Sequence, residues 1–166
     1  MKILVVCLGN ICRSPIAEGL MRQMAIEHQL DWTVDSAGTN GYHTGEPPHR
    51  DSQSICRQNG IDISKQRSRR FTARDFDDYD HILVMAEDVY QEVKRIARKP
   101  ADMDKVSYFL EPLYPNQQAA VPDPWYGPAS GYKPVFDLIQ KAGILLVSQL
   151  IQTSGNISNR TNSIKK

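Results

Sequence analysis

The sequence predicts an α/β fold built on a parallel sheet. Short apolar segments alternate with longer helical segments along the chain, and strands separated by helices form parallel β-α-β units with right-handed crossovers. The first segment, residues 3–6, is apolar at every position, as expected of a strand buried on both faces. The chain has 166 residues, enough for one core without disulfide or metal cross-links.

The other elements follow from periodicity and from residues that end helices. Helices are predicted where apolar residues recur at helical spacing, and Asn59 with Gly60 closes one of them. Pro100 lies beyond the end of another helix, and Pro134 is compatible with the first turn of the last one. The predicted strands are 3–6, 32–36, 82–85 and 106–109, and the predicted helices are 16–28, 50–58, 87–97 and 133–151.

We expect residues 1–152 to form a single domain. Residues 153–166 are mostly polar and lack periodicity, which is typical of a disordered tail.

Composition argues against several kinds of partner. The formal net charge is +1, so no strong field indicates nucleic acid or a membrane. We see no apolar run of about 18 residues and no secretory leader pattern. Three cysteines are too few for a disulfide framework, and the scattered histidines lack metal-ligand spacing. We therefore expect a cytoplasmic protein without a metal site, either monomeric or weakly self-associating.

The most informative segment is the loop after the first strand. Cys7 follows the strand directly, and Arg13 lies six residues later. Gly9 and Asn10, between them, tolerate positive φ. A loop that curls in this way turns successive backbone N–H groups toward one point and binds an anion.

The next helix is predicted to begin at the same place, with Ser14 as N-cap and Pro15 at its first helical position. The positive end of the helix dipole then adds to the anion site. A thiol beside an arginine and a helix N-terminus is readily ionised, so we expect Cys7 to be a nucleophilic thiolate. The alternative, from the pattern alone, is a buried cysteine at a strand end followed by an exposed arginine.

A long loop, residues 110–130, holds a second candidate. It is rich in proline, glycine and aromatic residues, and loops of this length in compact domains are functional or disordered. Asp123 lies between Pro122 and Pro124, which restrict the backbone on both sides. A turn-forming aspartate is the alternative explanation of this motif taken alone.

Together these motifs resemble the low-molecular-weight protein tyrosine phosphatases. The resemblance covers roughly residues 1–150 and is carried by segments in the order expected for the family. These segments are Cys7-Leu8-Gly9-Asn10-Ile11-Cys12-Arg13-Ser14-Pro15, Val34-Asp35-Ser36-Ala37-Gly38, Gly45-Glu46-Pro47-Pro48, Tyr79-Asp80-His81-Ile82-Leu83-Val84-Met85 and Asp123-Pro124-Trp125-Tyr126-Gly127.

The resemblance implies a four-stranded parallel sheet in the order 2-1-3-4, with helices on both faces and a phosphate-binding loop after strand 1. Cys7 then lies at a topological switch point, where open α/β sheets bind ligands. In the implied chemistry, Cys7 attacks phosphorus, Arg13 and the loop amides hold the phosphate, and Asp123 acts as general acid and then as base. The implied substrates are phosphotyrosine-containing proteins, the intermediate is a phosphocysteine, and no cofactor is needed.

The resemblance also assigns the residues around the nucleophile. Asn10 takes a left-handed conformation held by Ser14 and Ser36, and Ser14 also bonds the sulfur of Cys7. Relatives often add a histidine to this network where the present chain has Lys65. The phosphate-binding loop as a whole comprises Leu8, Gly9, Asn10, Ile11, Cys12 and Ser14 beside the nucleophile.

Two further roles are implied. Tyr42, Trp125 and Tyr126 wall the substrate pocket and stack on an aromatic substrate, with surface packing as the alternative for each. Cys7 and Cys12 form a redox pair whose disulfide protects the nucleophile and is reopened by thiols. The alternative is that Cys12 only fills space.

Basic residues followed by acidic ones lie between the predicted second helix and third strand. We interpret them as a solvated, self-compensating surface, with docking of phosphorylated or acidic partners as the alternative. The residues are Arg67, Arg69, Arg70 and Arg74, then Asp75, Asp77, Asp78 and Asp80.

Three other functions are weighed against phosphotyrosine hydrolysis. A thioredoxin-coupled arsenate reductase needs two further redox cysteines, but residues 79–99 contain no cysteine. A protein-arginine phosphatase has a polar threonine where this chain has the apolar Ile11, which suits a phenyl ring. A non-catalytic phosphotyrosine-binding module is expected to have lost Cys7 or Asp123, and this chain has both.

Overall fold

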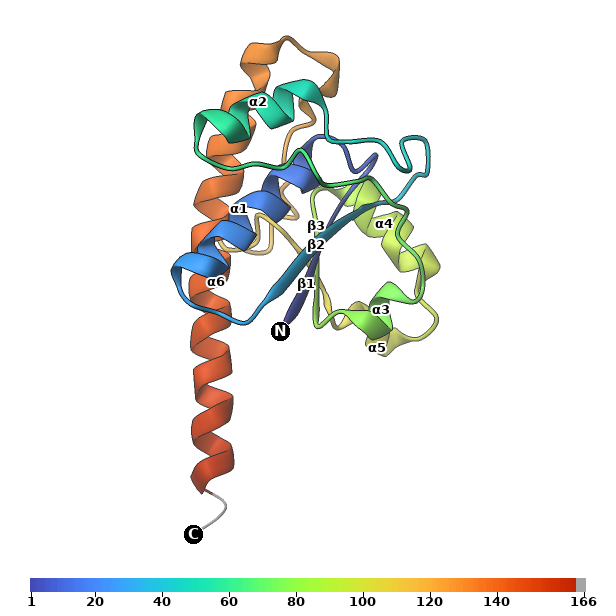
Figure 1. Cartoon of the computed structure of the whole chain (residues 1–166). Helices are drawn as coiled ribbons and strands as arrows, with labels where there is room; N and C mark the ends of the chain where they lie inside the picture. Colours follow the sequence, from blue (N-terminus) through green and yellow to red (C-terminus); the bar gives the residue numbers. More distant parts are fainter. Residues whose placement is uncertain (164–166) are drawn as a thin grey trace.

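A four-stranded sheet organises the molecule. The computed structural model describes residues 1–163, with the backbone alone from residue 155 onward. All strands are parallel and lie in the order β2-β1-β3-β4 (Figure 1), which confirms the predicted topology. The strands are β1 (Lys2–Cys7), β2 (Thr33–Gly38), β3 (His81–Val84) and β4 (Val106–Tyr108).

Strand β1 is buried on both faces, which explains its continuous apolar sequence. Side chains alternate across a strand, so Ile3 and Val5 pack on one face while Leu4 and Val6 pack on the other. None of the four has measurable exposure, and burying each such side chain contributes about 1.5–3 kcal/mol. The loop that follows β1 therefore starts from a rigid position.

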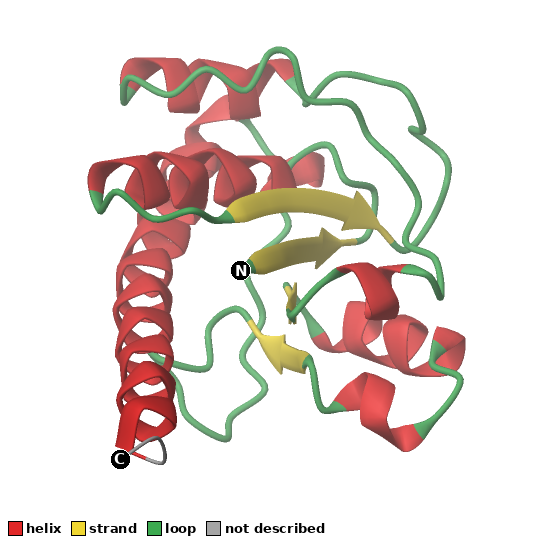
Figure 2. Cartoon of the chain, turned by 60° about the horizontal axis from the view of Figure 1, so that its bottom comes forward, coloured by secondary structure: helices red, strands yellow, loops and turns green. Residues whose placement is uncertain are grey.

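Helices cover both faces of the sheet (Figure 2). On one face lie α1 (Arg13–Glu27), α2 (Arg50–Gln58) and α6 (Tyr132–Ser163). On the other lie α3 (Asp75–Asp78), α4 (Glu87–Ile96) and α5 (Pro100–Met103). The long loop before α6 contains two 3₁₀ turns, η1 (Pro124–Tyr126) and η2 (Ala129–Gly131).

The predicted strands and long helices are all present, with most ends shifted by a few residues. The one-turn helices α3 and α5 were not predicted, because four residues are too few to show a helical period. The predicted N-cap of α1 is wrong: Cys12 holds that position, and Ser14 already lies in the helix. The Ser14 hydroxyl is engaged by the preceding loop instead of by the helix backbone.

Helix α6 extends further than its sequence period predicts. It reaches Ser163, well beyond residue 151, and so includes most of the segment predicted as a disordered tail. Its N-terminal part packs into the core through Phe136, Ile139 and Val147. A helix already anchored at one end adds one backbone hydrogen bond per further residue without needing an apolar face. The domain boundary at residue 152 stays a prediction, and residues 164–166 of the predicted tail lie outside the described residues.

The same helix is long and apolar enough to be compared with a membrane-spanning helix, although we expected no long apolar run in the chain. By length and composition alone, Ala129–Ser154, which contains an 18-residue window with a mean hydropathy of 1.4, could cross a membrane. Asp137 and Lys141 interrupt it, which is why no unbroken run appears in the sequence. Core helices pass the same test, and this one buries Phe136 and Ile139, so the finding is weak evidence for a membrane span.

Candidate active site

The candidate site lies at the carboxyl end of β1, where the chain turns into α1. At this point the strand order reverses, since β2 follows α1 on one side of β1 and β3 lies on the other. Open α/β sheets bind ligands at such a switch point. A cavity of about 230 Å³ opens there, and the loop of residues 7–14, which we call the phosphate loop, forms its floor.

The carbonyl groups of the phosphate loop point away from the cavity. Five of them accept hydrogen bonds from outside the loop, at 2.7–3.2 Å. Within the described residues, the backbone N–H groups of Leu8, Gly9, Ile11 and Cys12 have no acceptor. This is the arrangement of an anion-binding nest. The five donors are the N–H groups of Thr39, Asn40 and His49 and the hydroxyls of Ser52 and Ser68.

Gly38, the last residue of β2, allows this packing. A β-carbon there would lie 2.8 Å from the carbonyl oxygen of Leu8 and 3.0 Å from the backbone nitrogen of Asn10. Both neighbours are backbone atoms, which cannot move aside without moving the loop. Glycine at this position therefore lets the phosphate loop lie directly against the strand.

Asn10 sets the curl of the loop, as predicted. Its φ is 56°, in the left-handed region that costs most residues about 1–2 kcal/mol. Its side-chain amide donates to the hydroxyls of Ser14 and Ser36, at 2.8 Å each, and its Oδ1 accepts from the backbone N–H of Arg69 at 3.0 Å. Three contacts thus hold a residue that is 2% exposed in a strained conformation.

The hydrogen bonds around the Ser36 hydroxyl continue to Glu18. The hydroxyl donates to the Glu18 carboxylate at 2.5 Å, and burial raises the pKa of Glu18. Lys65, which stands where relatives often have a histidine, is exposed at the surface. The sequence analysis missed Glu18, because a single acidic residue within a helix gives no signal of a functional role.

The Cys7 sulfur is surrounded by donors. Its Sγ lies 3.0 Å from the Ser14 hydroxyl and accepts from the backbone N–H of Asn10 at 3.3 Å. The predicted contact with Ser14 is therefore present. The sulfur also faces the cavity lined by the loop and by Arg13.

Arg13 joins the phosphate loop to the long loop. Its guanidinium donates to the carbonyl of Val121 at 3.0 Å and to the carboxylate of Asp123 at 3.2 Å. Val121, in turn, donates its N–H to the carbonyl of Met85 at the end of β3, at 2.8 Å. The long loop is thereby tied to the sheet two residues before Asp123. Sequence analysis missed Val121, because a backbone carbonyl leaves no residue-type signal.

Asp123 faces the same cavity as Cys7 and Arg13, so the structure brings together the three predicted catalytic residues. Its Oδ1 accepts from the N–H of Trp125, which makes it the N-cap of η1. The turn-forming role considered from the sequence is thus real, and it coexists with a place in the site. One carboxylate oxygen caps the turn while the other contacts Arg13.

Aromatic side chains form the rim. Tyr42, Trp125 and Tyr126 line the cavity, as predicted, and are 85%, 41% and 88% exposed. Trp125 also lies against the rings of His43 and His49, with centroids 5.4 Å apart in each pair. His43, for which the sequence indicated no role, lines the cavity too.

Cys12 lies at the base of the loop, 4% exposed. Its sulfur is 3.5 Å from the hydroxyl of Tyr132, which lies 3.1 Å from His49 Nδ1. Burial raises the pKa of the Cys12 thiol to about 12, so this thiol is protonated at neutral pH. The described residues contain no disulfide, and Cys7, Cys12 and Cys56 are all free.

Comparison with known proteins identifies the family. Residues 2–155 match the family model described as low molecular weight phosphotyrosine protein phosphatase. The human protein of that name is 37% identical over 137 residues, which are 81% of this chain and 86% of the human one.

Two solved structures share the fold. One, a protein tyrosine phosphatase from Entamoeba histolytica with Hepes in its active site, has a TM-score of 0.85 at 32% identity, covering 93% of this chain and 99% of that one. The other, Vibrio vulnificus Wzb in complex with benzylphosphonate, has a TM-score of 0.78 at 28% identity, covering 89% and 97%.

Proposed function

The chain belongs to the low molecular weight phosphotyrosine protein phosphatase family, and from this premise we propose that it hydrolyses phosphotyrosine in proteins through a phosphocysteine intermediate. The observation that carries the proposal is the convergence of Cys7, Arg13 and Asp123 on one cavity floored by free backbone N–H groups. A nucleophile, an anion site and an acid within one cavity are the parts that phosphate-ester cleavage requires.

In the first step, the Cys7 thiolate attacks phosphorus and the bond to the phenolic oxygen breaks. The non-bridging oxygens accept hydrogen bonds from the loop amides and from Arg13, whose planar guanidinium matches two of them. Asp123 gives its proton to the departing phenolate, so the leaving group departs as neutral tyrosine. The product is a phosphate covalently attached to the Cys7 sulfur.

In the second step, water attacks the phosphocysteine. Asp123, now a carboxylate, takes a proton from that water, which is the reversal of its first role. The phosphorus–sulfur bond breaks, and the Ser14 hydroxyl, 3.0 Å from the sulfur, stabilises the thiolate that leaves. Inorganic phosphate is released and the starting enzyme is restored.

The rim supports an aromatic substrate. Tyr42 and Trp125 offer ring faces at the mouth of the cavity, and Ile11 in its wall is apolar. A phenyl ring gains from such contacts, whereas a phosphoguanidinium finds no polar partner in Ile11. The benzylphosphonate bound by the Vibrio protein has the same combination of ring and phosphorus oxyanion. Phosphotyrosine is therefore favoured over phosphoarginine, and a cytoplasmic location stays a prediction.

Replacing the nucleophile tests the proposal. Cys7→Ser should lower the hydrolysis of an aryl phosphate by more than about 10⁴-fold, since a serine hydroxyl is not ionised in this site. Its affinity for phosphate, measured by calorimetry, should remain, because the loop amides and Arg13 are unchanged. Cys56→Ser, at a buried thiol in α2 outside the cavity, is the matched control and should keep its kcat. Appreciable turnover by Cys7→Ser would exclude the phosphocysteine route.

A further inference from the structure

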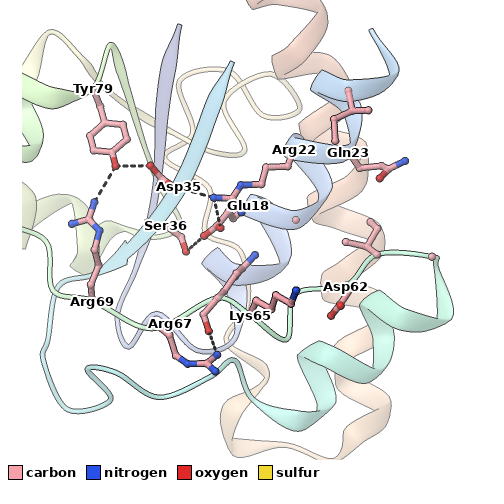
Figure 3. Close-up of a pocket in the computed structure, with 15 residues that line it drawn as sticks. Glu18, Arg22, Gln23, Asp35, Ser36, Asp62, Lys65, Arg67, Arg69 and Tyr79 are labelled. Carbon is pink, nitrogen blue, oxygen red and sulfur yellow. Dashed lines mark hydrogen bonds and ion pairs between the residues drawn. The ribbon is translucent and has the colours of Figure 1, made fainter. Parts of the chain in front are cut away.

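A second cavity, of about 560 Å³, lies behind the phosphate loop (Figure 3). Its walls come from α1, from β2 and from residues 60–69, and it shares no lining residue with the active-site cavity. Its volume falls within the roughly 300–1,000 Å³ typical of small-molecule sites. The proposed phosphatase chemistry uses none of this space.

Most of the charge on its inner wall is already paired. The Arg22 guanidinium lies 3.0 Å from Glu18 and 3.0 Å from Asp35. Asp35 also accepts from the hydroxyl of Tyr79 at 2.7 Å. Arg69 forms two hydrogen bonds to the buried Asp75, at 2.9 and 3.1 Å. These groups hold one another and leave little net charge for a ligand.

Lys65 and Arg67, two cations at the mouth of the cavity, differ from the paired residues of the inner wall. Among the residues with described side chains, neither Lys65 nor Arg67 has an ion pair with a carboxylate. Arg67 donates only to the backbone carbonyls of Ser64 and Gln66, at 2.9 and 2.7 Å. Both side chains are exposed at the cavity. They present two positive charges that an anion could neutralise, beside the exposed carboxylate of Asp62, which lines the same cavity.

Gln66, which lies between these two residues in the sequence and lines the same cavity, has an unused acceptor. Gln66 donates its side-chain N–H to the carbonyl of Pro15 at 3.2 Å, while its Oε1 is buried and has no hydrogen-bond partner in the described part of the chain. A buried acceptor without a partner is destabilising, because it has lost its hydrogen bonds to water. A ligand that brings a hydroxyl or amino donor to this oxygen would remove this destabilisation.

We propose that the second cavity binds a small-molecule phosphate monoester, whose dianion pairs with Lys65 and Arg67 while a hydroxyl or amino group of the same molecule donates to Gln66. The volume exceeds what inorganic phosphate needs and accommodates an attached sugar or nucleoside. A sugar phosphate and a nucleoside phosphate share this chemistry, since each joins a phosphate dianion to a hydrogen-bond donor.

The cavity is coupled to the active site by direct contacts. Ser36 and Arg69 both line the cavity, and both bond the side chain of Asn10, the residue that sets the curl of the phosphate loop. Gln66 also contacts Pro15 in the first turn of α1. An occupant that shifts residues 65–69 therefore shifts one of the three supports of Asn10, the backbone N–H of Arg69. This coupling rests on the proposed function, whereas the binding itself does not.

Binding is tested by amide NMR titration of the wild-type protein with AMP and, separately, with glucose 6-phosphate. We expect two groups of shifting resonances, one in the phosphate loop and one in residues 60–69, with different dissociation constants. The probe with the lower dissociation constant at the second cavity shows whether a nucleoside or a sugar is preferred as the attached group. Sodium chloride at matched ionic strength should not reproduce the second group.

Variants separate the two sites. Lys65→Ala with Arg67→Ala should weaken the second dissociation constant by about tenfold for each cation removed and leave the phosphate-loop response intact. Arg74→Ala, at an exposed arginine in the same basic run but outside the cavity, should change neither. Absence of the second group of shifts, or its persistence in the double variant, overturns the proposal.

Kinetics test the coupling. A cavity ligand should change kcat for an aryl phosphate at saturating substrate, whereas a competitor at the active site raises only KM. By linkage, an active-site ligand must change the affinity of the second cavity by the same factor. Binding at residues 60–69 with no change in kcat would refute the coupling and leave the second site standing. Loss of hydrolysis in every protein would instead count against the proposed function.

Discussion

The two loops that build the active site are held in contrasting ways. Most of the phosphate loop is buried, with Cys7, Asn10, Arg13 and Ser14 each at most 4% exposed, and five of its carbonyls accept hydrogen bonds from outside the loop. The acid loop, residues 121–131, is anchored at Val121 and then runs along the surface, where the Asp123 side chain is 31% exposed.

This contrast separates two tasks. Holding a phosphate at the transition state requires donors that do not move, since preorganised dipoles stabilise developing charge without reorganising. Admitting a tyrosine on a protein surface requires a rim that adjusts to different neighbours. Changes in the acid and in the buried loop should therefore act on kcat, and changes in the exposed rim on KM.

The largest effect in the acid loop is expected at Asp123. Asp123→Asn should lower kcat for phosphotyrosine by about 10²–10⁴-fold, because the phenolate leaves without a proton. For p-nitrophenyl phosphate the loss should be much smaller, since p-nitrophenolate is a good leaving group. The check is a comparison of kcat for the two substrates. An equal loss for both would show that Asp123 positions Arg13, which it contacts at 3.2 Å, and is not the acid.

A smaller effect is expected at the support of the buried loop. Asn10→Ala removes three hydrogen bonds and leaves a non-glycine residue at a φ of 56°, so we expect kcat to fall by about 10–100-fold through misplacement of the loop. Asn10→Gly tolerates that φ but also lacks the hydrogen bonds. If Asn10→Gly restores kcat fully, conformation alone matters and the hydrogen bonds to Ser14 and Ser36 do not.

The fold was predictable from sequence to the extent that burial leaves a pattern. The strand β1 was found because its burial on both faces leaves a continuous apolar run, and α1 was found because apolar residues recur in it at helical spacing. The end of α6 was missed because its backbone continues without an apolar period. The N-cap of α1 was assigned to Ser14 from residue preference, but the loop uses that hydroxyl for the Cys7 sulfur and for Asn10. A competing tertiary contact overrode the local preference.

For the candidate site too, the sequence revealed some residues and not others. Cys7, Arg13 and Asp123 stand in motifs whose residue types state their chemistry, and the structure brings them together. The groups that position them left no such signal. Val121 contacts Arg13 through its backbone carbonyl. Glu18 accepts a hydrogen bond from Ser36, which in turn accepts one from Asn10. Such contacts arise only when the chain is folded.

A moderate effect is expected on recovery from oxidation, which tests the pairing of Cys7 with Cys12. We expect peroxide to oxidise the Cys7 sulfur to a sulfenic acid and attack by the Cys12 thiol then to form a disulfide with loss of water. Dithiothreitol should restore most activity in the wild type and several-fold less in Cys12→Ser, where Cys7 proceeds to irreversible acids. The assay is residual hydrolysis after peroxide and then thiol. Because burial raises the pKa of Cys12 to about 12, the protective step should speed up as pH rises toward that value.

If recovery is equal in wild type and Cys12→Ser, Cys12 only packs beneath the loop. Cys56→Ser is the control, since Cys56 has the same raised pKa, also about 12, but lies in α2 outside the site. It should recover like the wild type.

The smallest effect is expected at the rim. Tyr126 is 88% exposed, and no ring contact holds it within the described residues, whereas Trp125 is flanked by two histidine rings. Tyr126→Ala should raise KM for a phosphotyrosine peptide by about threefold, the loss of one exposed aromatic contact, with kcat unchanged. Trp125→Ala should raise KM more, since it also removes the ring contacts with His43 and His49. Steady-state kinetics on a peptide and on free phosphotyrosine make the comparison, and a fall in kcat for Tyr126→Ala would mean that the exposed rim positions Asp123 as well as the substrate.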